Sequence, residues 1–206
     1  MSDIYIKHEL KRDPNGSIAI DPSSGNLSMQ EVGQRKAGHL APNYNMGWNN
    51  SISYQGLTLG FVLSARVGGL AYSATQGILD YYGGSKATAD ARDNGGIPIN
   101  FGKVDAKKYY QTISTAEGGY GAYYLYSATN VRLQELSLSY DLPKKWFSNK
   151  LNLSIGLLAR NLWMIYCKAP FDPELSASTS SNYYQGVDYF MLPSTRNIGF
   201  NVKVQF

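Results

Sequence analysis

The sequence has little charge, one cysteine and no long apolar run. Only 17% of its 206 residues are charged, and the net charge of +4 comes from scattered Lys and Arg residues. With no basic stripe and no RNA-module motif, nucleic-acid binding is not expected. Cys167 stands alone, which excludes an internal disulfide and carries no metal-ligand spacing. No run approaches the roughly 18–20 apolar residues of a spanning helix, so a helical membrane protein is excluded.

Patterns of catalysis and export are also missing. His8 and His39 form no metal or catalytic set, and no Ser-His-Asp arrangement, carboxylate pair or phosphate loop is evident. We therefore predict neither an enzyme nor a metal site, and no cofactor. Residues 1–7 lack the apolar segment of a signal peptide. An exported protein needs such a segment, so if the chain is exported we expect it to be a piece of a longer one.

Tyrosine and glycine are abundant, with 17 and 21 residues, which suits sheets with amphipathic surfaces. Strands are predicted where apolar and polar residues alternate with a period of two. A strand of about eleven residues at ~3.3 Å each, tilted by ~45°, spans roughly 26 Å, close to the apolar band of an outer-membrane barrel. Five segments have this pattern: 44–55, 57–68, 130–142, 151–162 and 196–206.

The polar face of these segments indicates a hydrated lumen, because it consists of Asn, Ser, Gly and Gln more than Lys and Glu. One segment changes parity: Val131 and Leu133 alternate out of phase with Leu136 and Leu138. Either a bulge near Gln134 or a strand that leaves the membrane there would explain the change.

The connections alternate between short and long, as in outer-membrane barrels with long extracellular loops. Residues 55–56 and 143–150 form short links, whereas 70–129 and 165–195 are long loops. The predicted fold class is therefore all-β, the C-terminal portion of a transmembrane β-barrel with about five long antiparallel strands in residues 44–206. Residues 1–43 are predicted to be an extracellular loop segment with short strands. Because a barrel needs about eight strands to close, five of them predict a fragment.

Several motifs, in this order, resemble the C-terminal part of SusC/RagA-type TonB-dependent outer-membrane transporters. Residues 130–143 (NVRLQELSLSYDLP) resemble a characteristic strand of that family, and residues 54–59 (YQGLTL) resemble its hairpin. Residues 160–162 (RNL), 171–174 (FDPE) and 186–196, which include GVDY and LP, resemble the strand end, the loop and the approach to the final strand.

The resemblance implies a barrel of about 22 strands with an N-terminal plug, of which this chain supplies the last five strands. It implies a place in the cell outer membrane, surrounded by lipid, and import of oligosaccharides, or of peptides. The implied partners are a surface lipoprotein of the SusD type, the remainder of the barrel and plug, and the TonB complex, which acts through the missing N-terminal part. Two alternatives stay open: a soluble or surface-anchored carbohydrate-binding β-sandwich, and a structural outer-membrane barrel or adhesin.

Two groups of candidate functional residues follow. The last strand resembles a signal for barrel assembly, carried by Phe200, Val202, Val204 and Phe206. In the long loops, aromatic rings that stack on sugars lie beside polar groups that bind hydroxyls, although the same residues would suit loop packing or a lipoprotein lid. The candidates for ligand contact are Tyr81, Tyr82, Asp90, Arg92, Asp93, Asn94, Tyr183 and Tyr184.

Two local structures are also predicted. Residues 73–82 are expected to form a short helix that ends at Gly83. Asp172 and Glu174 are expected to serve in a proline-bounded turn.

Overall fold

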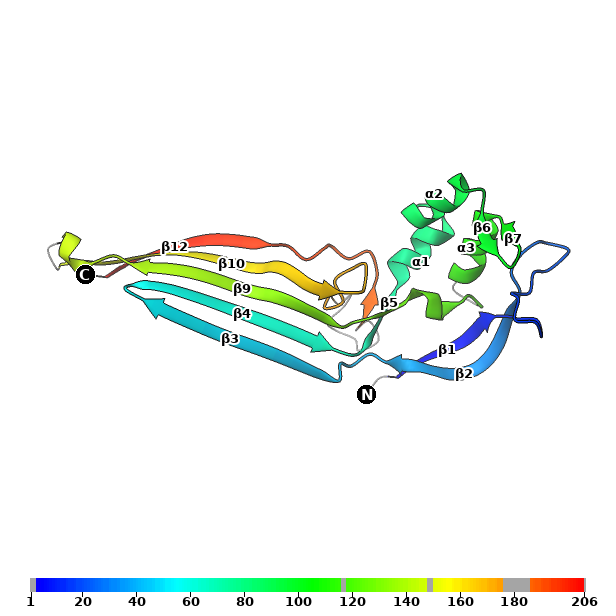
Figure 1. Ribbon diagram of the computed structural model, residues 1–206, viewed down its shortest axis with the longest axis horizontal. Helices are drawn as coiled ribbons and strands as arrows, with labels where there is room; N and C mark the ends of the chain where they lie inside the picture. Colours follow the sequence, from blue (N-terminus) through cyan, green and yellow to red (C-terminus); the bar gives the residue numbers. More distant parts are fainter. Residues whose placement is uncertain (1–2, 116–117, 148–149, 176–185, 206) are drawn as a thin grey trace. The chain divides into compact units, whose positions relative to one another are not determined.

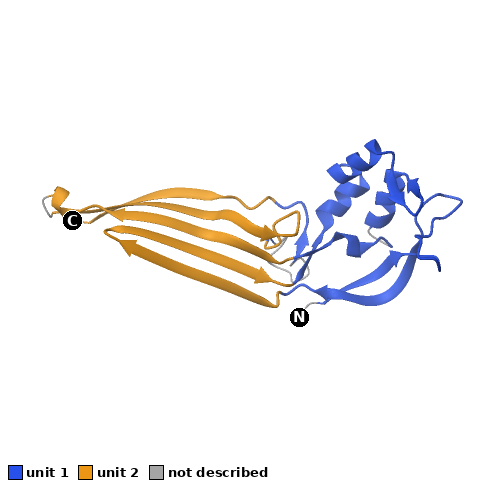
Figure 2. Cartoon of the chain, in the orientation of Figure 1, with its two compact units in different colours: residues 1–41, 69–127, 175–191 blue, residues 42–68, 128–174, 192–206 orange. Residues whose placement is uncertain are grey.

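The computed structural model describes residues 3–115, 118–147, 150–175 and 186–205 (Figure 1). Its chain divides into two compact units, each assembled from segments that are distant in the sequence (Figure 2). Unit 1, blue in Figure 2, comprises residues 1–41, 69–127 and 175–191, and unit 2, orange, comprises residues 42–68, 128–174 and 192–206. The predicted division at residues 43 and 44 stays a prediction.

Unit 2 is a sheet of five long antiparallel strands in the order β12-β10-β9-β4-β3 (Figure 1). The five predicted strands are thereby confirmed. Between β3 and β4, Gln55 and Gly56 have φ angles of 47° and 84°. Two consecutive positive φ angles are characteristic of the tightest hairpin turns. The strands are β3 (Tyr44–Tyr54), β4 (Leu57–Val67), β9 (Asn130–Asp141), β10 (Asn152–Cys167) and β12 (Asn197–Gln205).

The parity change in β9 is a bulge at Gln134. In β4, Val62 pairs with Glu135 and the next residue, Leu63, pairs with Leu133, so Gln134 has no partner in the ladder. An extra residue of this kind returns the following side chains to the original face of the sheet. Of the two explanations that the sequence allowed, the structure therefore has the bulge.

Strand β10 is longer than the sequence predicted. Its alternation stops near Asn161, which has a φ angle of 52°, and the prediction ended the strand at residue 162. Pairing with β9 resumes at Trp163, opposite Leu133, and continues to Cys167, opposite Asn130. The predicted loop 165–195 therefore begins inside the strand, because an irregularity of pairing changes the phase of the alternation without ending the sheet.

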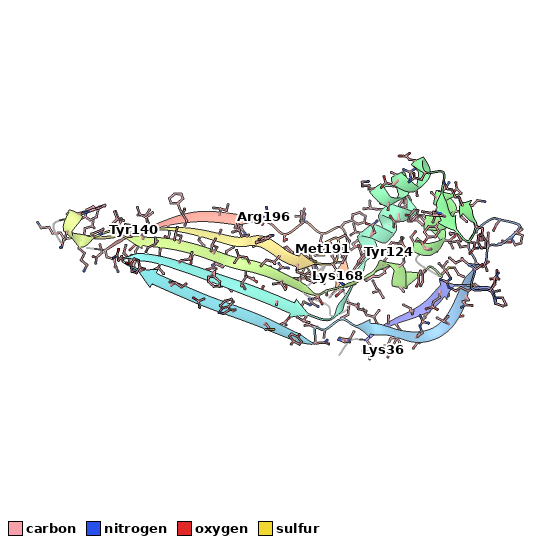
Figure 3. The ribbon with its side chains drawn as sticks, in the orientation of Figure 1. Lys36, Tyr124, Tyr140, Lys168, Met191 and Arg196 are labelled. Atoms are coloured by element: carbon pink, nitrogen blue, oxygen red, sulfur yellow. The ribbon has the colours of Figure 1, made fainter. Side chains whose placement is uncertain are left out.

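One face of the sheet is apolar across all five strands. A row of directly paired residues crosses the sheet through Ile52, Leu59, Leu138, Leu157 and Phe200. These side chains stay exposed, from 38% for Leu59 to 79% for Phe200. The neighbouring row has Tyr54 and Tyr140 at the end of the sheet where β3 turns into β4. Figure 3 labels Tyr140. A tyrosine at the edge of an apolar band is typical of a membrane–water interface.

The opposite face is polar and bonded across the strands. Ser53 and Thr58 hydroxyls lie 2.9 Å apart, and the Arg160 guanidinium pairs with Glu135 at 3.0 Å. Gly60 leaves space for a neighbour, since a Cβ atom there would lie 2.5 Å from Ser137 Oγ. This face therefore suits a water-filled interior.

The described residues of unit 1 combine small sheets with three short α-helices (Figure 1), whereas the sequence predicts a long loop for residues 70–129. Each helix is capped at its N-terminus by a side chain. Ser73, Ser85 and Asp105 each accept a hydrogen bond from the backbone N–H three residues later in the sequence. The predicted helix at residues 73–82 is confirmed. The helices are α1 (Ala74–Tyr81), α2 (Lys86–Asp93) and α3 (Ala106–Ser114), with the short η1 (Gly121–Tyr124). Unit 2 adds a similar turn, η2 (Lys144–Phe147).

Within the described part of unit 1, the strands form three small sheets. In the first, β1 and β2 pair antiparallel. In the second, β5 lies between β8, antiparallel, and β11, parallel. The third sheet is the hairpin of β6 and β7. The strands are β1 (Asp3–Leu10), β2 (Met29–His39), β5 (Leu70–Ser73), β6 (Ile97–Ile99), β7 (Gly102–Val104), β8 (Leu125–Ser127) and β11 (Val187–Asp188).

The core of unit 1 holds the helices together. Its most buried members include Ile113 and Tyr124, each 1% exposed, and Ala106 at 3%. Leu27 from the N-terminal segment joins this cluster, so residues distant in sequence share one core. No helix in the described ranges is long and apolar enough to cross a membrane.

Candidate functional site

Unit 1 contains a cleft of about 340 Å³ between its three helices. Capping by Ser73, Ser85 and Asp105 fixes where each helix begins and hence which side chains reach this space. Gly83 has a φ angle of 74° and turns the chain after α1, next to Tyr82. The cleft is lined by Asp80, Tyr81, Tyr82, Gly83, Thr88, Arg92, Ala106, Lys107, Tyr110 and Gln111.

The inner wall of the cleft is built on a buried carboxylate. Asp80 is 2% exposed and accepts hydrogen bonds from Gln76 Nε2 at 2.8 Å and from the Tyr124 hydroxyl at 3.1 Å. Figure 3 labels Tyr124, which comes from η1. Burial and the neighbouring charge of Asp80 raise the pKa of Tyr124, so this tyrosine keeps the proton that it donates. Burial also raises the pKa of Tyr110 to about 12, so the Tyr110 ring is neutral.

The mouth of the cleft is aromatic and positively charged. The rings of Tyr81 and Tyr82 meet edge to face, with centroids 5.1 Å apart, and Tyr82 is 81% exposed. Arg92 Nη1 donates to the carbonyl of Gly83 at 3.0 Å, which holds the guanidinium at the edge of the cleft. Lys107 is exposed, and no ion pair of Lys107 occurs within the described residues.

The structure brings together three of the predicted contact residues, Tyr81, Tyr82 and Arg92. Three others, Asp90, Asp93 and Asn94, are not among the lining residues: Asp90 pairs with Lys86 at 2.8 Å, and Asn94 ends α2. All three are exposed. Tyr183 and Tyr184 fall outside the described residues. Whether any of these side chains contacts a ligand stays a prediction.

Sequence reasoning missed the contribution of α3. Lys107, Tyr110 and Gln111 lie three and four residues apart, which places them on one side of a helix. The signal was present in the sequence as Asp105 followed by a nine-residue segment with apolar residues at helical spacing. The long loop that the sequence predicts for residues 70–129 does not include this helix.

A second cleft of about 360 Å³ adjoins the first, since Tyr81 and Gln111 line both. At this cleft, Lys108 Nζ donates to the carbonyl of Ser24 at 2.5 Å. The remaining lining is mostly polar, so hydroxyl and amide groups continue from the first cleft into the second. The second cleft is lined by Asn26, Leu27, Met29, Tyr81, Lys108, Gln111, Thr112, Thr115 and Gly118.

Unit 2 holds a buried ion pair on the polar face of its sheet. Arg132 in β9 binds both carboxylate oxygens of Asp172, at 2.6 and 3.2 Å, and lies 3.4 Å from Glu174. The side chains of Arg132 and Asp172 are only 7% and 8% exposed. Burial opposes ionisation of Asp172, but hydrogen bonds from Arg132 and from the Glu174 N–H outweigh it and lower the pKa.

The turn prediction for Asp172 and Glu174 therefore described only part of their role. Asp172 Oδ1 does accept from the Glu174 N–H at 3.1 Å, as expected of a turn. The ion pair with Arg132, forty residues away along the chain, additionally fixes this turn to the sheet.

The last strand carries the predicted assembly signal in an exposed position. Phe200, Val202 and Val204 alternate along β12 and are 79%, 54% and 46% exposed. Each pairs with an apolar residue of β10, so β12 continues the apolar face. Phe206 lies outside the described residues, and recognition of this strand in barrel assembly stays a prediction.

No protein-family model matches the chain. Among curated proteins, it is similar to the TonB-dependent receptor P3 of Formosa agariphila, with 25% identity over 201 residues. The alignment covers 94% of this chain and 19% of that receptor, so the chain spans about a fifth of its relative's length. The resemblance to SusC/RagA-type TonB-dependent transporters is confirmed.

Solved structures agree on the fold. The RagAB peptide importer in the closed-closed state matches with a TM-score of 0.57 and 18% identity, covering 98% of this chain and 22% of that one. The RagAB peptide transporter matches with a TM-score of 0.59 and 19% identity, covering 97% and 24%. The predicted all-β barrel fragment is thereby confirmed, and its place is the cell outer membrane. The similar proteins are a receptor and importers; the prediction that the chain is not an enzyme stays a prediction.

Proposed function

We propose that the chain forms the C-terminal strands of an outer-membrane TonB-dependent transporter that imports oligosaccharides or peptides. The observation that supports this most is the five-stranded sheet, with one apolar face and one polar face crossed by hydrogen bonds. A wall between lipid and a hydrated passage needs these two faces on the same strands. The rest of the barrel and a plug would complete the passage.

The proposed partners follow from the resemblance to SusC/RagA-type transporters. A surface lipoprotein of the SusD type would deliver substrate, and the TonB complex would act through the plug-bearing part of the protein. Lipid would cover the apolar face. The matching structures are named RagAB peptide importer and RagAB peptide transporter. These names support a transport role and support peptides as one of the two proposed substrate classes.

A carbohydrate-binding β-sandwich is not supported by the exposure of the apolar face. A sandwich buries that face between two sheets. Here Ile52, Leu157 and Phe200 of one cross-strand row are 57% to 79% exposed, and a sheet of this kind requires an apolar surrounding.

Deletion of the codons for residues 1–206 from the host chromosome tests the proposal. We expect growth to be lost on one class of nutrient, either a polysaccharide or a protein digest, and to be kept on simple sugars. Restoring the intact gene should restore growth, and deleting the gene for TonB should cause the same loss. Normal growth of the deletion strain on all polymers, with a changed envelope permeability, would instead indicate a structural barrel or adhesin.

A further inference from the structure

The solvent-facing charge of the first cleft in unit 1 is positive. Arg92 and Lys107 are both exposed at the cleft, on α2 and α3. Asp80 is the only carboxylate among the described lining residues, and its two oxygens already accept from Gln76 and Tyr124. Because the Asp80 carboxylate is buried and already bonded, the charges that a ligand meets in the cleft are those of Arg92 and Lys107. A carboxylate group of a ligand would bind both cations strongly.

An aromatic ring stands beside these cations. Tyr82 is 81% exposed, and its edge-to-face contact with Tyr81 orders the ring before any ligand binds. A large ring that has little freedom to lose provides contact area at low entropic cost. The apolar face of a sugar ring matches such a surface, and Gln111 supplies an amide that can donate to and accept from hydroxyls.

We propose that this cleft binds an acidic oligosaccharide, with a sugar ring on Tyr82 and its carboxylate at Arg92 and Lys107. The proposal rests on the proposed transport function, which makes unit 1 accessible to substrates outside the cell. The second cleft shares Tyr81 and Gln111 with the first, so a chain of several sugars can continue past α3.

The architecture of the lining favours a sugar over a peptide. An extended peptide is usually held by the free N–H and C=O groups of a sheet edge. The side chains here come mainly from helices α1, α2 and α3, whose backbone groups are largely bonded within the helices. A sugar needs only side-chain partners, and the cleft offers these.

Binding should be measured by calorimetry on the complete purified transporter in detergent. The probes are tetragalacturonate, which is acidic, the neutral maltotetraose, and the acidic peptide tetraglutamate. We expect tetragalacturonate to bind and the other two probes to bind at least about tenfold more weakly, because they lack either the carboxylates or the sugar rings. Binding should also weaken as the salt concentration rises.

Two variants locate the site. Lys107→Gln and Tyr82→Ala should each weaken tetragalacturonate binding roughly tenfold, and Lys107→Gln should also reduce the dependence on salt. The matched control is Lys86→Gln, which removes an exposed lysine of α2 that pairs with Asp90 outside the cleft. An unchanged electrophoretic shift on heating would show that each variant barrel is folded.

Three results would overturn the inference. Maltotetraose could bind as tightly as tetragalacturonate, or tetraglutamate could bind more tightly. The affinity for tetragalacturonate could also be unchanged in both the Lys107→Gln and the Tyr82→Ala protein. This readout is separate from transport. If the growth defect of the deletion strain appears but tetragalacturonate does not bind, the transport function stands and the acidic-sugar site is wrong. If tetragalacturonate binds at the cleft but the deletion strain grows normally, the site stands and the transport function is wrong.

Discussion

Replacing Arg132 with methionine should release the turn that contains Asp172 from the polar face of the sheet. The Asp172 side chain is 8% exposed and would lose a partner that binds both of its oxygens. Removing one member of a buried ion pair costs about 3–5 kcal/mol, because the remaining charge stays buried without compensation. At about 1.4 kcal/mol for each factor of ten, opening of residues 168–174 should increase roughly 140- to 3700-fold.

Hydrogen exchange of the amides in residues 168–174, measured by mass spectrometry on the complete transporter, reports this opening. The matched control is Arg160→Met, which breaks the pair with Glu135; those side chains are 64% and 34% exposed. Breaking such an exposed pair should cost less than about 1 kcal/mol. The double variant Arg132→Met with Asp172→Leu should restore most of the protection, since it leaves no buried charge between those two positions.

Equal exchange in the Arg132→Met and Arg160→Met proteins would refute this reasoning. It would mean that the turn is held by its own backbone and by the surrounding chain, with no measurable contribution from the ion pair. Failure of the double variant to regain protection would locate the effect in the packing of the arginine stem instead of its charge.

Three further predictions concern the Asp172 carboxyl, the Tyr124 hydroxyl and the apolar face of the sheet. Folding lowers the pKa of Asp172, so its stabilising effect is complete above the pKa of the unfolded chain and is lost as the pH falls through the pKa of the folded protein. Protection of the amides in residues 168–174 from exchange, corrected for the intrinsic exchange rate, should therefore stay level from neutral pH to about 5. It should decrease below about pH 4. Tyr124→Phe removes a donor from Asp80 and should destabilise α1 by about 1.5–3 kcal/mol, seen as faster exchange in residues 74–81; unchanged exchange would contradict it. Leu136→Arg places a charge on the apolar face and should cost about 2–4 kcal/mol in urea unfolding of the transporter in lipid, whereas Ser139→Arg on the polar face should cost much less; equal costs would contradict the assignment of the faces.

The strands and their faces could be predicted from the sequence because their signal is local. Alternation along one strand reports which side chains share a face, whatever the neighbouring strands are. Tyr54 and Leu57, on either side of a two-residue turn, were enough to place one hairpin. Helix α1 could also be predicted from local signals, because Ser73 and Gly83 mark its two ends.

The phase of β9 could not be settled in this way. Val131 and Leu133 were compatible with a bulge or with a strand end, because only the pairing partners distinguish the two. The structure decides through Leu63, which pairs with Leu133 directly after Val62 has paired with Glu135. The length of β10 was missed for the same reason, since its pairing continues beyond the interruption at Asn161.

The loop predicted for residues 70–129 left out helices α2 and α3, although Asp105 and the apolar spacing after it indicate α3. Helices of eight or nine residues also have little stability of their own. Packing of Ala91 and Ile113 into a core shared with Leu27 stabilises them, and that core exists only in the folded chain.

The sequence by itself therefore determined the amphipathic strands, their order along the chain, and which side chains face lipid and which face the hydrated interior. Each of these properties depends only on residues that are close together in the sequence. Tertiary structure alone decided which residues meet at each site. Arg132 meets Asp172 from forty positions away, and Tyr82, Arg92 and Lys107 reach one cleft from three separate elements. Contacts of this kind depend on how elements pack, and a periodicity along the chain contains no information about packing partners.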